Sequence, residues 1–164
     1  NLRSQGLHMA FLRVGPVMDL NRSLALAMHG TVIGERLPNR RFAWETRAEF
    51  EPWLQGRVGP VTWQDRNRLE VRFREDRMRL RYRNLFRLNW APRDARAIPY
   101  AWDEVMVDLS GEGNHQNRFT VGVGAVVGRG IRVDGGYMLR TRRAQGAWVH
   151  DHVMLLSVFV GWPG

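Results

Sequence analysis

Hydrophobic and polar residues alternate along most of this chain with a period of two, which is the period of a β-strand. In the segment RNRLEVRFR, residues 66–74, the apolar side chains of Leu69, Val71 and Phe73 alternate with arginine and glutamate. After a short polar break, residues 77–90 repeat the alternation, with arginine on one side and mostly apolar side chains on the other. We predict that these two segments form a β-hairpin.

The same alternation, strong in some places and weaker in others, predicts about nine strands of roughly 8 to 13 residues. These segments are residues 6–14, 23–33, 42–50, 66–74, 77–90, 101–109, 118–127, 131–140 and 151–162. No segment needs a helix, and the prolines, Pro52 and Pro99 among them, are expected between strands, where no ladder hydrogen bond is required. We therefore predict an all-β, antiparallel, up-and-down fold that forms one domain over residues 1–164.

The alternation gives each strand two faces but does not say which face meets water. A soluble barrel buries its apolar face, whereas a transmembrane barrel turns that face to lipid and its polar face to the lumen. Three features favour the second arrangement: strands long enough to span a bilayer, tryptophans near strand ends, and a polar face that carries both charge signs. We therefore predict a transmembrane β-barrel, with a soluble ligand-binding barrel as the alternative.

Composition narrows the possible functions. The chain has 25 Lys and Arg against 16 Asp and Glu, a formal net charge of +9, and no cysteine. The absence of cysteine excludes disulfides and thiolate metal sites, and no apolar run reaches the roughly 18 residues of a helical membrane span. The positive charge raises the question of nucleic acid, but the aromatic residues lie mostly on the face opposite the arginines, so we expect no nucleic-acid partner.

The polar face is the candidate site, and we predict that its charges line one lumen. Isolated charges that face hydrocarbon cost several kcal/mol, so arginines and carboxylates should gather inside and pair between neighbouring strands. The predicted network is structural and consists of Glu45, Arg47, Glu49, Arg66, Arg68, Glu70, Arg72, Arg79, Arg81, Arg83, Glu104, Arg118, Arg132, Asp134 and Arg140.

A catalytic or metal-binding role has little support in the sequence. His150 and His152 share a face, yet two histidines without further ligands at suitable spacing are a weak metal signal. In the predicted register His152 faces lipid and Ser157 faces the lumen, which places them out of hydrogen-bond reach. We therefore predict no enzyme activity, no catalytic residue, no cofactor and no metal site.

Two smaller features also carry expectations. The glycines of the strands near the end of the chain, Gly122, Gly124, Gly135 and Gly136, are expected to leave room for bulky neighbours inside a small barrel. Asp65 and Asn67 fall on the lipid face of the predicted register. We therefore expect a β-bulge or the membrane boundary at that point.

Five motifs give the chain a family resemblance. They are the arginine-rich strand Arg66–Phe73, Asp103–Val105, Gln116–Gly124, Val133–Tyr137 and Asp151–Ser157. In this order they resemble the uncharacterised bacterial outer-membrane β-barrel family catalogued as domain of unknown function 2490. The resemblance extends from about Phe42 onward, with Asp151 in place of an asparagine.

The resemblance implies a barrel in the bacterial outer membrane, and it implies no activity. Its partners would be outer-membrane lipid and lipopolysaccharide, with other envelope proteins as further candidates. Such barrels have an even number of strands, so the nine segments imply about ten strands, with the first upstream of Asn1 and the last closing at Trp162. We expect a structural or anchoring component of an envelope assembly; the alternatives are a narrow anion-preferring channel and a soluble ligand-binding barrel.

Overall fold

Antiparallel strands make up nearly all of the chain. The computed structural model describes residues 9–36, 41–74, 77–111, 115–128, 130–144 and 146–160. Its strands are β1 (Met9–Val14), β2 (Val17–Asp19), β3 (Leu24–Arg36), β4 (Phe42–Val58), β5 (Val61–Arg74), β6 (Arg77–Trp90), β7 (Ala97–Asp108), β8 (Gln116–Gly128), β9 (Ile131–Ala144) and β10 (Ala147–Val160). No helix among these residues is long and apolar enough to cross a membrane.

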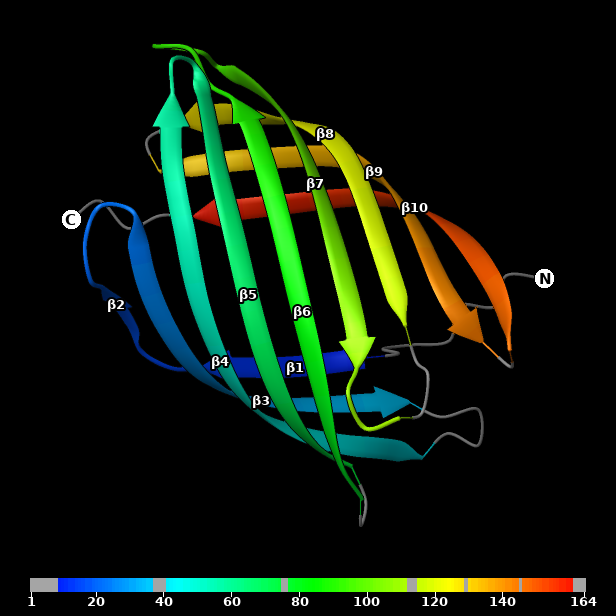
Figure 1. Cartoon of the computed structure of the whole chain (residues 1–164). Helices are drawn as coiled ribbons and strands as arrows, with labels where there is room; N and C mark the ends of the chain where they lie inside the picture. The colour runs from blue at the N-terminus through cyan, green and yellow to red at the C-terminus, as the bar shows by residue number, and fades with distance from the viewer. Residues whose placement is uncertain are drawn as a thin grey trace.

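The ten strands form one antiparallel sheet. Nine of them follow the order β1-β3-β4-β5-β6-β7-β8-β9-β10, and β2 pairs with β3 off this path. The sheet curls into a half-barrel (Figure 1). This confirms the predicted all-β, up-and-down fold, and β5 and β6 form the predicted hairpin. Eight antiparallel steps separate β1 from β10, so these two edge strands run in the same direction.

The short strand β2 is absent from the sequence prediction. Both β1 and β2 pair with β3, so the two segments lie along β3 as one interrupted strand. The interruption falls at Gly15 and Pro16. A Cβ atom on Gly15 would lie 2.7 Å from the Cα atom of His29, so the close approach to β3 requires glycine.

The prediction that Pro52 and Pro99 lie between strands is wrong, because they lie inside β4 and β7. The ladder between β4 and β5 passes Pro52 without a change of register, from Phe50↔Leu69 to Trp53↔Arg66. One missing N–H is therefore tolerated where the flanking pairs hold the strand. As a result β4 is longer than the sequence pattern suggested.

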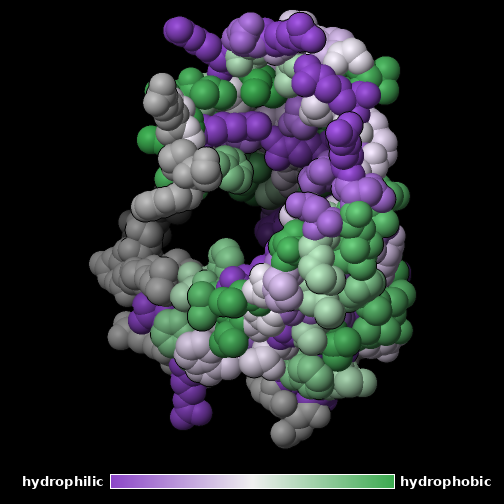
Figure 2. All heavy atoms as spheres, turned by 90° about the vertical axis from the view of Figure 1, so that its left-hand side faces the viewer, coloured by the Kyte–Doolittle hydropathy of each residue, from purple (hydrophilic) through white to green (hydrophobic). Residues whose placement is uncertain are grey.

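Charged side chains lie on the inner face of the curled sheet and large apolar side chains lie on the outer face. On β8, Phe119, Val121 and Val123 are 48%, 44% and 47% exposed, whereas Thr120 between them is fully buried. Figure 2 shows hydrophilic side chains around a hollow and hydrophobic side chains over the adjoining outer surface. The inner face holds few buried apolar residues, so much of the interior is filled by polar side chains: Thr31, Glu45, Glu49, Glu51, Arg68, Glu70, Glu104, Thr120 and Asp134.

Asp65 and Asn67 lie on the outer face, as predicted, in the middle of β5. The predicted bulge is not there, because β5 pairs with β6 through both residues without a register shift. Amide groups satisfy the Asp65 carboxylate instead: Asn84 Nδ2 donates to Oδ1 over 2.6 Å, and Asn67 Nδ2 donates to Oδ2 over 3.2 Å. A similar contact joins β7 and β8, where Asn117 Nδ2 donates to Asp103 Oδ1 over 2.9 Å.

Candidate functional site

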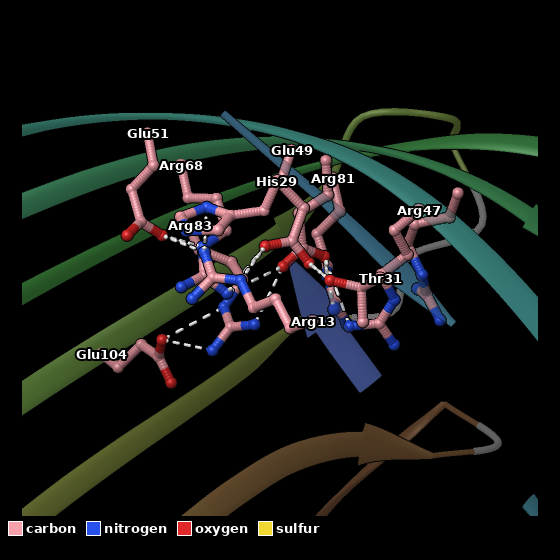
Figure 3. Close-up of polar contacts among 12 residues, drawn as sticks. Arg13, His29, Thr31, Arg47, Glu49, Glu51, Arg68, Arg81, Arg83 and Glu104 are labelled. Atoms are coloured by element: carbon pink, nitrogen blue, oxygen red, sulfur yellow. Dashed lines mark hydrogen bonds and ion pairs between the residues drawn. The ribbon is translucent and has the colours of Figure 1, made fainter. Parts of the chain in front are cut away.

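The candidate site is the set of ionised side chains on the inner face of β1 and β3–β10, which we call the lumenal charge network. Alternation along each strand brings every second side chain to this face, and strand register then decides which of them meet. Figure 3 shows its central part, where side chains from β1, β3, β4, β5, β6 and β7 point toward one another. Buried glutamates form the centres, and arginines surround them.

Glu51 on β4 is the first of these centres, and its side chain is fully buried. Its Oε2 atom accepts from Arg68 Nε on β5 and, over 3.1 Å, from Arg13 Nη2 on β1. Arg66 Nε lies 3.9 Å from the same oxygen, and Trp53 Nε1 donates to Oε1 over 2.5 Å. Three guanidinium groups and an indole therefore compensate one buried carboxylate.

Glu70 on β5 is the second centre and is also fully buried. Arg81 Nη2 lies 2.5 Å from Glu70 Oε2, and Arg83 Nη1 donates to Oε1 over 2.8 Å. Arg68 Nη1 and Arg47 Nη1 approach the carboxylate to 3.5 Å and 3.9 Å. Glu70 therefore joins guanidinium groups from three adjacent strands, β4, β5 and β6.

Glu104 on β7 is the third centre and is 2% exposed. Arg83 Nη2 lies 2.5 Å from its Oε1 atom and Arg66 Nη2 lies 3.7 Å from the same oxygen. Arg118 Nη1 on β8 lies 3.5 Å from Oε2. Since Arg83 on β6 also binds Glu70 on β5, this one side chain connects the second and third centres from the strand that lies between them.

Further contacts extend the network toward β1 and β3. Glu49 accepts a hydrogen bond from Thr31 Oγ1 over 2.9 Å, and Arg13 Nε lies 2.8 Å from its other oxygen. Glu45 accepts from Arg72 through both oxygens, over 2.8 and 2.7 Å, and also accepts from Arg47. Because Arg72 lies on β5 and Glu45 on β4, this bidentate pair joins two strands.

The last strands carry separate ion pairs. Arg132 donates to both oxygens of Asp134 on its own strand, over 2.5 and 2.9 Å. Arg140 on β9 donates twice to Asp151 Oδ2 on β10, over 2.9 and 2.7 Å. Arg142 reaches the same oxygen over 3.2 Å. Asp151 is therefore the carboxylate that binds the edge strand β10 to the network.

The structure places the fifteen residues of the predicted network on one face of the sheet by their register. The prediction missed Arg13, Glu51, Arg87 and Asp151. Glu51 has the same parity as Glu45 and Glu49 and would have been found by continuing the alternation past residue 50. Arg87 likewise continues the arginine series of β6. Arg13 lies in a weakly patterned segment and gave no comparable signal.

The residues considered for catalysis lie apart. His152 is on the outer face, where its Nδ1 atom shares a hydrogen bond with Tyr137 Oη, and His150 Nδ1 lies 3.0 Å from Thr141 Oγ1. Ser157 has the opposite parity on β10 and therefore faces inward. Over the described parts of the chain, no three His, Asp or Glu residues are grouped so that they could hold a metal ion. The chemistry that the site offers is charge compensation and the binding of anions by arginine.

One comparison with known proteins found a matching protein family. The family profile described as "Protein of unknown function (DUF2490)" matches residues 3–150. This range includes residues 3–41, which the resemblance did not cover, and it ends before the closing motif Asp151–Ser157. Neither a curated protein nor a solved structure matches the chain.

Proposed function

Because the chain belongs to the family of proteins of unknown function DUF2490, whose description assigns no activity, we propose a function from the geometry of the sheet. The proposed function is that of an integral outer-membrane β-barrel that acts as a structural or anchoring component of an envelope assembly. Outer-membrane lipid and lipopolysaccharide would contact its outer face. Its ion-paired interior would give rigidity without an apolar core.

The observation that carries this proposal is the inverted distribution of side chains. Glu51 and Glu70 are fully buried inside, whereas large apolar side chains such as Met154 and Leu156 are 80% and 78% exposed outside. A soluble protein rarely exposes apolar patches larger than a few hundred Å², because exposed apolar area costs about 25 cal/mol per Å² in water. Lipid removes that cost, and paired charges inside avoid the larger cost of facing hydrocarbon.

Strand length also supports a location in the membrane. The strands β3 to β10 have 12 to 17 residues each, with β4 the longest. Crossing the hydrocarbon core takes about 9 to 11 residues in a tilted strand, whereas strands of soluble proteins commonly have about 5 or 6. Each of these eight strands is therefore long enough to cross a bilayer.

The experiment that tests the proposal is extraction of the full-length protein from the membranes of the bacterium that produces it. We expect it to stay with the outer-membrane fraction through washes with high salt and with sodium carbonate, and to need detergent for solubilisation. Release by either wash, or a monodisperse protein in buffer without detergent, would contradict the proposal. A periplasmic binding protein and a known porin provide the two controls.

A channel is the second candidate, and the charge balance of the lumen favours it. Arginines outnumber carboxylates among the fifteen predicted residues, so a conducting lumen would prefer anions. Conductance of the purified protein in a planar bilayer separates the two candidates. An anchor with an interior filled by arginine side chains gives no stable unitary current, whereas a channel gives one with anion selectivity.

A further inference from the structure

One end of the lumen contains a cavity of about 580 Å³ that the charge network does not fill. It lies where β4, β6 and β10 end and where β3, β5 and β9 begin, so its walls come from opposite parts of the sheet. We call it the arginine vestibule. Its charged lining residues are Arg22, Arg57, Arg87, Arg132 and Asp134, and its aromatic lining residues are Trp63 and Phe159.

Arg87 is held rigidly at the inner wall of the vestibule. Its Nη2 atom donates to Asp134 Oδ2 over 3.3 Å, which reaches from β6 to β9 across the two strands between them. Its Nε atom donates to Asn89 Oδ1 over 2.8 Å, and its guanidinium carbon lies 4.5 Å from the centre of the Tyr100 ring. A guanidinium group fixed by an ion pair, an amide and an aromatic face loses little entropy when it binds a ligand.

Glycines create the space in which this arrangement fits. A Cβ atom on Gly122 would lie 2.5 Å from Tyr100 Cζ, and one on Gly124 would lie 2.6 Å from Arg132 Nε. Side chains at these two positions would displace the tyrosine under Arg87 and the arginine beside Asp134. The two glycines therefore leave the space that Tyr100, under the Arg87 guanidinium group, and the Arg132 guanidinium group occupy.

The charge of the vestibule is not balanced by its own carboxylate. Asp134 is 4% exposed and already binds both Arg87 and Arg132. Arg57 donates to the carbonyl oxygens of Gly59 and Ala91, over 2.9 and 2.8 Å. Across the described residues, neither Arg57 nor Arg22 forms an ion pair with a carboxylate. Four guanidinium groups thus face one carboxylate, and the excess positive charge attracts an anion.

We propose that the arginine vestibule binds a small organic anion, with a carboxylate or phosphate group recognised by Arg87 and Arg132 and an apolar part against Phe159. The cavity volume is in the usual range for small-molecule sites, about 300 to 1,000 Å³. Neutral polar side chains, Gly56 and a second aromatic residue, Trp63, complete its lining. This proposal does not depend on the proposed membrane location, since the vestibule lies inside the curled sheet.

Phenyl phosphate is a suitable probe because it joins one anionic group to one aromatic ring. We expect isothermal titration calorimetry on the purified full chain to show saturable binding of one probe molecule per chain. Benzyl alcohol, which has the ring without the charge, should not bind at the same concentration. Salt at about 0.5 M screens charges strongly and should weaken the binding of phenyl phosphate. Absence of saturable phenyl phosphate binding at millimolar concentration would overturn the proposal.

Variants locate the binding within the lumen. Arg132→Gln removes a guanidinium group of the vestibule and should weaken binding by about tenfold or more. Arg22→Gln changes an exposed side chain that holds no strand together, so it preserves the fold and should weaken binding about two- to fivefold through charge alone. Arg140→Gln changes a lumenal arginine outside the cavity and should leave the affinity unchanged. Equal affinities in all three variants would overturn the assignment to this cavity.

The anionic group could come from a free solute or from a lipid headgroup, and two further probes distinguish these sources. Inorganic phosphate presents the anion alone, whereas dihexanoyl phosphatidic acid below its micelle concentration presents it with acyl chains. Tighter binding of the lipid than of phenyl phosphate supports a lipid headgroup, and equal or weaker binding supports a free organic anion. In either case Arg132→Gln must bind the probe more weakly than the wild type does. Equal affinity would place the site elsewhere.

Discussion

Arg13 on the edge strand β1 reaches across β3 and donates to Glu51 on β4 over 3.1 Å. The pair therefore joins two strands that share no backbone hydrogen bonds. The Glu51 side chain is fully buried and the Arg13 side chain is 25% exposed. This contact fastens a six-residue edge strand to the interior of the sheet.

Removing the Glu51 charge should destabilise the sheet strongly. In Glu51→Gln, Arg13 and Arg68 lose the carboxylate that compensates their charge, and breaking a buried ion pair costs about 3–5 kcal/mol. Unfolding in guanidinium chloride, followed by tryptophan fluorescence, measures the change in the free energy of unfolding. The matched control is Glu35→Gln, because the Glu35 side chain is 57% exposed and 3.7 Å from Arg74; it should cost less than about 1 kcal/mol. Equal effects of the two variants would show that the buried network does not determine stability.

A charge on the outer face tests what surrounds the sheet. Val121 is 44% exposed near the middle of β8. Val121→Arg should cost about 2–4 kcal/mol in a bilayer, whereas an exposed substitution in water changes stability by about 0.5 kcal/mol or less. Unfolding from lipid vesicles measures this cost. Val127→Arg, near the end of the same strand, is the control and should cost about 0–1 kcal/mol.

Two neighbouring glycines should respond differently to the same substitution. Gly122→Ala places a Cβ atom 2.5 Å from Tyr100 inside the sheet, and such overpacking costs about 1–3 kcal/mol. Gly135 has no atom within 4 Å of its would-be Cβ atom. Gly135→Ala should therefore leave the free energy of guanidinium unfolding unchanged or raise it slightly. This also corrects the sequence prediction, which gave Gly135 the same space-making role as Gly122, Gly124 and Gly136.

The polar group on the outer face should remain in contact with water. Asp65 and Asn67 are hydrogen-bonded to one another and to Asn84, and no guanidinium group is among the hydrogen-bond partners of the Asp65 carboxylate over the described residues. We expect a water-soluble maleimide to label Asn67→Cys faster than Val121→Cys in vesicles, because polar groups retain hydration at the membrane boundary. Equal, slow labelling would mean that Asn67 lies within the hydrocarbon.

Much of the fold could be predicted from the sequence because side-chain alternation is a local property of a strand. The parity of Arg66, Arg68, Glu70 and Arg72 follows from the extended backbone alone, whatever strand lies beside them. The hairpin of β5 and β6 follows from two such segments with a short polar break between them. The same local rule assigned His152 and Ser157 to opposite faces, which is where the structure has them.

Only the tertiary structure decided which face is concave and which charges meet. Alternation is the same whether the arginine face turns inward or outward, and the curvature of the whole sheet settles that choice. The sharing of Arg83 by Glu70 and Glu104 depends on the registers of three strands, which no single segment encodes. The Arg87–Asp134 contact across two intervening strands depends further on glycines that leave the space empty. The sequence by itself determined the two faces of each strand; long-range pairing, which fixes distances between residues far apart in the chain, determined the site.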